Sequence, residues 1–224
     1  MGKALYIAEK PSVAQEFANA LKISARRSDG YLESDTAVVT WCVGHLVTMS
    51  YPEAYDPKYK RWSLQTLPFL PKEFKYQVID GVSKQFQIVS RLLNRSDIDT
   101  IYICTDSGRE GEYIYRLVDQ MAGVHGKERR RVWIDSQTEE EILRGIREAR
   151  DWKEYDNLAA SAYLRAKEDY LMGINFSRLL TLKYGNSISN FLHTKYAVIS
   201  VGRVMTCVLG MVVRREREIR EFVK

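Results

Sequence analysis

The sequence has few cysteines and lacks the patterns of several protein classes. Its three cysteines, Cys42, Cys104 and Cys207, are isolated in apolar surroundings and form no C-x-x-C pair. This spacing disfavours a structural zinc site and a disulfide framework, so we expect buried thiols in a reducing compartment. No apolar run approaches the roughly 18 residues of a membrane span, and no signal peptide precedes the first predicted strand. These absences favour a cytoplasmic protein with no membrane partner.

A large excess of charge of one sign is also missing. Lys and Arg number 34 against 29 Asp and Glu, which gives a net charge of +5 over 224 residues. Such mild basicity permits a nucleic-acid partner without requiring one, because a charge excess commonly reflects a solvated surface. The hydrophobic fraction of 45% is ordinary for a globular protein, and the length suffices for one large or two small domains.

Short apolar runs alternate with helical patterns along the first two thirds of the chain. Helix starts are marked by two predicted capping boxes, Ser12 with Gln15 and Thr138 with Glu141. This alternation predicts an α/β fold in which a parallel sheet with right-handed crossovers is flanked by helices. The expected strands are residues 4–8, 36–41, 100–104 and 131–134, and a further helix is expected at 82–94.

The pattern changes near residue 150. Four of the five prolines lie in residues 50–75, which predicts an irregular, packed excursion. Residues 155–182 and 200–223 have helical patterns with no strand between them. We therefore predict a first domain at 1–150 and a mostly α-helical unit at 151–224. The chain stops within a charged helix that has no terminal cap, so we expect it to be part of a longer protein.

Acidic residues follow two of the predicted strands. Glu9 and Lys10 follow the first, and Asp106 and Glu110 follow the strand at 100–104. The carboxyl ends of parallel strands are where sites form in such sheets. The pair Asp106 and Glu110 suits Mg²⁺, which takes oxygen ligands, whereas Glu9 and Lys10 suit proton transfer and phosphate neutralisation. The alternative for Asp106 and Glu110 is a helix start whose acidic residues complement the macrodipole. The alternative for Glu9 and Lys10 is a surface turn.

Other polar residues suit a phosphate backbone. His45 follows Gly44 after a predicted strand, where exposure is expected. The helical unit carries Arg165, Arg178 and Arg203, with Ser200 and Thr206 nearby. These groups suit contacts to a single nucleic-acid strand, and the alternative is a set of solvated arginines.

Taken together, these segments resemble type IA DNA topoisomerases, most closely those of the bacterial topoisomerase III group. The resemblance spans nearly the whole chain and rests on the order and spacing of its motifs. These are "LYIAEKPSVAQ", "VVTWCVGHL", "RWSLQTLP", the Asp-x-x-x-Glu run with "REGE", "YLMGINFSR" and "SVGRVMT".

The resemblance implies a Toprim domain at 1–150, followed by the start of the domain that lines the single-strand DNA groove. It implies that Glu9 and Lys10 are catalytic and that Mg²⁺ is held by Glu9, Asp106 and Glu110. The implied partner is DNA, in single-stranded segments of supercoiled or catenated duplex, and we expect a monomer. The implied DNA contacts are His45, Arg109, Arg165, Arg178, Ser200, Arg203 and Thr206.

The family reaction joins a tyrosine to a 5′ phosphate, passes another strand through the break and reseals it without ATP. The absence of a G-x-x-x-x-G-K-[ST] loop agrees with this. None of the 14 tyrosines stands in the family's Tyr-x-Arg-Thr-like motif, so we expect no cleavage by this chain alone. Alternatives are another Toprim nuclease or primase-type enzyme, or a non-catalytic single-strand DNA-binding protein.

A second departure concerns the acidic motif, which in the family is usually Asp-x-Asp-x-Glu. Gly108 stands at the middle position, and Glu112 is a candidate substitute further along the helix. We therefore predict weaker or differently arranged Mg²⁺ binding.

Overall fold

The structure is a computed structural model that describes residues 2–23 and 26–223. It contains two compact units that are interleaved along the chain. Unit 1 comprises Met1–Met49 and Tyr76–Tyr163, and unit 2 comprises Ser50–Lys75 and Leu164–Lys224. The sequence predicts consecutive domains that meet near residue 150. The interleaving arises because the proline-rich excursion groups with the second helical segment.

Unit 1 is built on a seven-stranded mixed sheet whose centre is parallel. The pairs β4 with β1, β1 with β7, and β7 with β8 are parallel, and the outer pairs are antiparallel. In order across the sheet the strands are β2 (Arg26–Ser28), β3 (Tyr31–Glu33), β4 (Ala37–Trp41), β1 (Lys3–Ala8), β7 (Ile98–Cys104), β8 (Glu128–Arg131) and β9 (Arg150–Asp151). A separate antiparallel ribbon joins β5 (Val47–Met49) to β6 (Tyr76–Val78).

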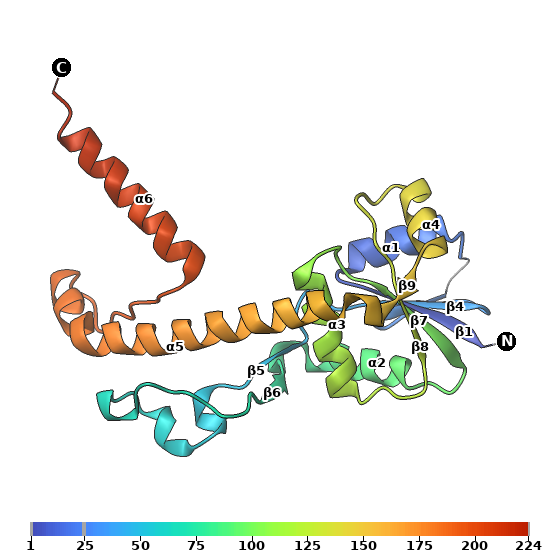
Figure 1. The fold of residues 1–224 in the computed structure, drawn as a ribbon, viewed down its shortest axis with the longest axis horizontal. Coiled ribbons are helices and arrows are strands. Elements are labelled where there is room, and N and C mark those ends of the chain that lie inside the picture. Colours follow the sequence, from blue (N-terminus) through green and yellow to red (C-terminus); the bar gives the residue numbers. More distant parts are fainter. Residues whose placement is uncertain (1, 24–25, 224) are drawn as a thin grey trace. The chain divides into compact units, whose positions relative to one another are not determined.

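Helices cover both faces of the sheet. Figure 1 shows α1 (Pro11–Ala20) and α4 (Glu139–Arg147) on one face, and α2 (Ser83–Leu93) and α3 (Arg109–Ala122) on the other. The central strands are apolar because both their faces are covered, as in other parallel sheets. Leu5, Ile7, Ile101 and Ile103 are completely buried there. The predicted α/β fold is confirmed, with antiparallel strands added at both edges.

Helix starts follow the sequence in one case and depart from it in another. The predicted cap at Thr138 is confirmed, since its hydroxyl accepts a hydrogen bond from the Glu141 N–H. The predicted capping box at Ser12 is wrong. The helix start lies two residues earlier, since α1 begins at Pro11 and Lys10 occupies the N-cap position without a side-chain hydrogen bond. Proline favours the first helical position because its fixed φ already suits a helix.

Two further expectations are corrected. The strand predicted at 131–134 lies at Glu128–Arg131, because it is these residues that pair in parallel with Thr100–Ile103 of β7. Among the cysteines, Cys42 and Cys104 are buried free thiols as predicted, but Cys207 is exposed. It lies on α6 (Arg203–Arg220), whose residues are all exposed in this structure.

Unit 2 combines the excursion with most of the long helix α5 (Asp156–Phe191), followed by α6. The excursion forms the 3-10 turns η1 (Pro52–Ala54), η2 (Pro57–Lys60) and η3 (Leu64–Thr66). Asn175 on α5 accepts a hydrogen bond from the Phe69 N–H at 2.6 Å and donates one to the Phe69 carbonyl at 2.9 Å. The Tyr170 hydroxyl donates to the Ser50 carbonyl at 2.5 Å. These bonds satisfy backbone groups of a segment that has no sheet partner.

In the described part of the chain, no helix is both long enough and apolar enough to cross a lipid bilayer.

Candidate active site

Three loops meet at the carboxyl edge of the central sheet. β1 lies between β4 and β7, with Ala8 in register with Trp41 on one side and Cys104 on the other. Glu9 directly follows β1 and is bonded to both neighbouring loops. Its carbonyl accepts the Gly44 N–H at 3.0 Å, and its side-chain Oε2 accepts the Asp106 N–H at 3.3 Å. The structure thus brings together the first two acidic residues that the sequence singles out.

The environments of these two carboxyl groups differ. Glu9 is only 8% exposed, whereas Asp106 is exposed. Burial, followed by the nearby Asp106 carboxylate, raises the pKa of the Glu9 carboxyl above its usual value. The hydrogen bond from the Asp106 N–H and the charges of Lys10 and His45 oppose this shift. Glu9 therefore binds a proton more readily than a free glutamate does, and it lies beside a second acid.

Glu110 lies in the first turn of α3, where its charge complements the macrodipole. Its Oε1 is 2.7 Å from Nε2 of His45, which follows β4. This pair is largely exposed, with Glu110 at 70% and His45 at 41% side-chain exposure. Lys10 and Arg109 are also exposed at this edge. The predicted polar residues of unit 1 therefore all follow β1, β4 or β7.

The acidic residues fit a magnesium ion that retains water. In the described residues, no three His, Cys, Asp or Glu side chains come together as a complete metal cage. The Asp106 carboxylate accepts no hydrogen bond from the described part of the protein, and Glu9 Oε2 lies at the Asp106 backbone. Mg²⁺ is commonly held by one or two carboxylates together with waters and substrate phosphate. Glu9 and Asp106 have the chemistry of such a site.

Glu112 does not belong to this acidic edge. It is completely buried, and its Oε2 lies 2.9 Å from Nε of Arg131, whose side chain is also completely buried. Its Oε1 lies 2.9 Å from Nε of Arg116. The idea that Glu112 substitutes as a metal ligand is therefore wrong, because two guanidinium groups occupy its oxygens. Sequence reasoning missed Arg131, and its only signal was an arginine at the edge of an apolar run.

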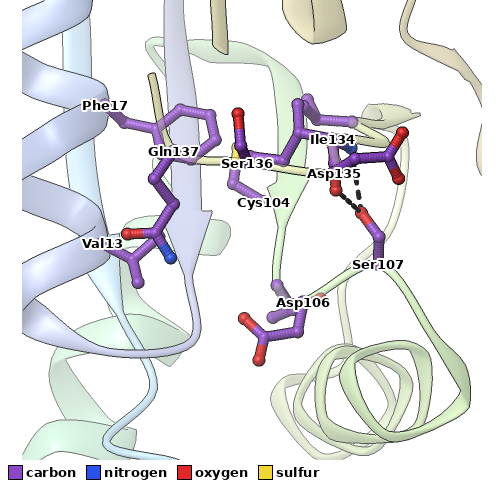
Figure 2. Close-up of a pocket in the computed structure, with 11 residues that line it drawn as sticks. Val13, Phe17, Cys104, Asp106, Ser107, Ile134, Asp135, Ser136 and Gln137 are labelled. Atoms are coloured by element: carbon purple, nitrogen blue, oxygen red, sulfur yellow. Dashed lines mark hydrogen bonds between the residues drawn. The ribbon is translucent and has the colours of Figure 1, made fainter. Parts of the chain in front are cut away.

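A pocket of about 300 Å³ opens beside Asp106, between α1 and the loop before α4. Figure 2 shows the Asp106 side chain at one end of it and the Phe17 ring at the other. The Ser107 hydroxyl fixes the wall, since it donates to the Ile134 carbonyl at 2.8 Å and accepts the Ile134 N–H at 2.9 Å. The loop that carries Asp106 is thus tied to the segment that follows β8.

The residues predicted in unit 2 have different environments. Arg165, Ser200 and Thr206 are exposed. Arg203 is half-exposed and forms an ion pair with Asp169 at 2.6 Å. Arg178 is 6% exposed, and its Nη1 donates to the Tyr59 carbonyl at 3.0 Å while its guanidinium lies over the Trp62 ring. Arg178 therefore packs inside unit 2, and its contact to DNA stays a prediction.

Comparison with known proteins agrees with this arrangement. A sequence model of the Toprim domain matches residues 4–136, which include Glu9 and Asp106. A second model, described as DNA topoisomerase, matches residues 153–224. The two matches follow one another along the chain.

Several curated relatives are bacterial. "DNA topoisomerase 3" of Bacillus subtilis (strain 168) is 41% identical over 222 residues, which are 99% of this chain and 29% of the relative. "DNA topoisomerase 3" of Bacillus thuringiensis (strain Al Hakam) has the same identity and coverage. The chain thus spans under a third of the length of these relatives. With a Toprim domain followed by a DNA topoisomerase segment, the chain belongs to the type IA DNA topoisomerase family.

Proposed function

We propose that this chain supplies the Toprim part of an active site that cleaves, passes and reseals single DNA strands. The observation that carries the proposal is the contact between Glu9 and Asp106, two acids from neighbouring parallel strands. The nucleophile is a tyrosine outside this chain. The reaction requires Mg²⁺ and no ATP, because the covalent intermediate conserves the energy of the phosphodiester.

In the proposed cleavage, the tyrosine hydroxyl gives its proton to solvent, its oxygen attacks the scissile phosphorus, and the bond to the 3′ oxygen breaks. The departing 3′ oxygen needs a proton, and Glu9 is suited to donate it because its pKa is raised. Lys10 lies next to Glu9 and is exposed, so it can neutralise a phosphoryl oxygen. Resealing is the reverse: the 3′ hydroxyl returns its proton to Glu9, its oxygen attacks the phosphorus, and the bond to the tyrosine oxygen breaks, with that oxygen taking up a proton from solvent.

Asp106 and Glu9 would hold Mg²⁺, and the ion would supply positive charge to the phosphate. Glu110, with its carboxylate on His45, lies four residues after Asp106 in the first turn of α3 and is the further acid at this edge. His45 and Arg109 would contact the DNA backbone near the cleaved bond. Arg165, Ser200, Arg203 and Thr206 would contact the single strand in unit 2, and all four are accessible.

The test is relaxation of negatively supercoiled plasmid, with Mg²⁺ titrated from zero. It compares the longer protein that would contain this chain with its Glu9→Gln variant, and it includes the 224-residue chain alone. We expect relaxation by the longer protein in Mg²⁺, a loss of about 100-fold or more in Glu9→Gln, and none by the chain alone. Glu16→Gln is the matched control, because Glu16 is exposed on α1 and should leave the rate unchanged.

Full relaxation by Glu9→Gln would remove Glu9 from the chemistry. Inactivity of the longer protein at every Mg²⁺ concentration would instead favour a non-catalytic role in binding single strands.

A further inference from the structure

The guanidinium of Arg131 is completely buried at the end of β8. Arginine is almost never fully buried unless it is paired, because removing its charge from water is costly. Its charge partner is Glu112 on α3, also completely buried, at 2.9 Å between Nε and Oε2. The other contacts of the guanidinium must therefore offset much of the cost of burying both charges.

Most of its remaining donors serve one short segment of backbone. Nη1 donates to the carbonyls of Ile103 at 3.0 Å and Thr105 at 2.7 Å, and Nη2 donates to the carbonyl of Asp106 at 2.6 Å. A further bond from Nη1 reaches Val132 at 3.0 Å. β7 ends at Cys104, so the carbonyls of Thr105 and Asp106 lie beyond the strand. The guanidinium gives them the partners that they would otherwise lack.

α3 is fixed to the same segment from the other side. The Thr105 hydroxyl donates to the Gly111 carbonyl at 2.8 Å. A Cβ added at Gly111 would lie 2.1 Å from the Asp106 carbonyl oxygen, so only glycine allows this close approach. Glu112, the next residue, binds Arg131. The Asp106 peptide is therefore held between the start of α3 and the Arg131 guanidinium.

We propose that Arg131, with Glu112 as its counter-charge, is a positioning residue that fixes the Asp106 peptide and thereby sets the affinity of the Asp106 carboxylate for Mg²⁺. This inference rests on the proposed function in one respect, namely that Asp106 binds the metal. Arg131 itself is buried and contacts no substrate. Lysine cannot replace it, because a single ammonium lacks the planar fork that reaches several carbonyls at once.

The chain offers a matched control on the same strand. Arg129 lies two residues before Arg131 and forms an ion pair with Asp119 of α3 at 2.7 Å. It also donates to the carbonyls of Val124 and Lys127, which lie after α3 and away from Asp106. Both arginines thus join β8 to α3 through a largely buried ion pair, but only Arg131 touches the segment that carries Asp106.

The experiment measures Mn²⁺ affinity by electron paramagnetic resonance for the chain and for its Arg131→Lys, Arg129→Lys and Asp106→Asn variants. Thermal unfolding and amide hydrogen exchange at residues 104–107 are recorded on the same samples. We expect Asp106→Asn to abolish the site. Arg131→Lys should weaken Mn²⁺ binding by about 10-fold or more, the loss seen when a group that orients a metal ligand is removed. It should also speed amide exchange at residues 104–107. Arg129→Lys should lower the unfolding temperature but change neither the Mn²⁺ affinity nor the exchange at 104–107.

Suppose that Asp106→Asn binds no Mn²⁺ and that Arg131→Lys binds it as tightly as the unchanged chain does. This result would overturn the positioning role and leave the proposed function intact. Absence of any site that depends on Asp106 would overturn the metal part of both proposals. Hydrogen exchange then decides whether Arg131 holds the Asp106 peptide, and equal exchange in the two lysine variants would reject that as well.

Discussion

Gly108 occupies the position where type IA topoisomerases usually have a second aspartate, and its surroundings leave room for one. Its backbone is extended, with φ 168° and ψ 180°, and an added Cβ meets no atom within 4 Å. We therefore expect Gly108→Asp to fold normally and to add a fourth carboxylate at this edge, beside those of Glu9, Asp106 and Glu110. The Mg²⁺ concentration for half-maximal plasmid relaxation by the longer protein should fall by roughly 10-fold, because affinity rises with the number of charged ligands.

Gly108→Asn is the control for this change, since it has nearly the same shape without the charge. It should leave the Mg²⁺ midpoint where it is. A midpoint that moves equally in both variants would mean that side-chain bulk at 108, and not charge, affects the site.

Individual residues show where prediction from the sequence is limited. Glu9 and Asp106 could be paired from the sequence because each follows an apolar strand, and such ends meet at one edge. Glu112 and Arg178 could not be placed, because burial of a charge depends on a partner distant in the sequence. Their partners are Arg131, 19 residues away, and the Tyr59 carbonyl, 119 residues away.

At the scale of elements, the apolar strands and amphipathic helices were predictable and the polar edges were not. β1 and β7 follow from short apolar runs, and α2 at Ser83–Leu93 matches the helix expected at 82–94. β2 and β9 contain only polar residues, and β3 has Leu32 as its single buried residue. All three lie at or near the edges of the sheet, where one face or edge meets solvent. Such short strands form through their neighbours and carry little periodic signal of their own.

The excursion at 50–75 depends on Asn175, whose amide binds both backbone groups of Phe69. Removing it leaves a donor and an acceptor without their partner in a partly buried place. Asn175→Ala should therefore lower the free energy of unfolding of unit 2 by about 2 kcal/mol, measured by urea denaturation and followed by tryptophan fluorescence. Trp62 lies within this excursion and reports on it.

Asn186→Ala is the matched control on the same helix, because Asn186 is exposed. It should change the unfolding free energy by less than about 0.5 kcal/mol. Equal effects of the two substitutions would show that the loss in Asn175→Ala reflects helix content and not the bond to Phe69.

At the scale of the whole molecule, the small net charge is the sum of two units whose net charges have opposite signs. Unit 2 contains 16 Lys and Arg against 8 Asp and Glu, a net charge of +8, which leaves unit 1 at −3 within the total of +5. The total alone gives a weak indication of a nucleic-acid partner. This difference in net charge could not be predicted from the sequence, because it depends on the excursion at 50–75 belonging to unit 2. It agrees with the proposal that unit 2 contacts the DNA backbone.

Arg165 tests this proposal, since it is exposed on α5 and no ion pair to it occurs among the described residues. We expect Arg165→Ala to weaken binding of the chain to a single-stranded oligonucleotide of about a dozen bases. The slope of log affinity against log salt should become shallower by about 0.7, the value for one lost phosphate contact on a single strand. Fluorescence anisotropy over a series of salt concentrations measures both quantities.

Arg91→Ala removes one exposed cation from unit 1 and changes the total charge by the same amount. If binding depends on contacts in unit 2, this control keeps both the affinity and the salt slope of the unchanged chain. If binding responds only to the net charge of the molecule, Arg91→Ala and Arg165→Ala weaken it equally. The second result would remove Arg165 from the proposed contacts, because a diffuse attraction depends on total charge rather than on the place of any one arginine.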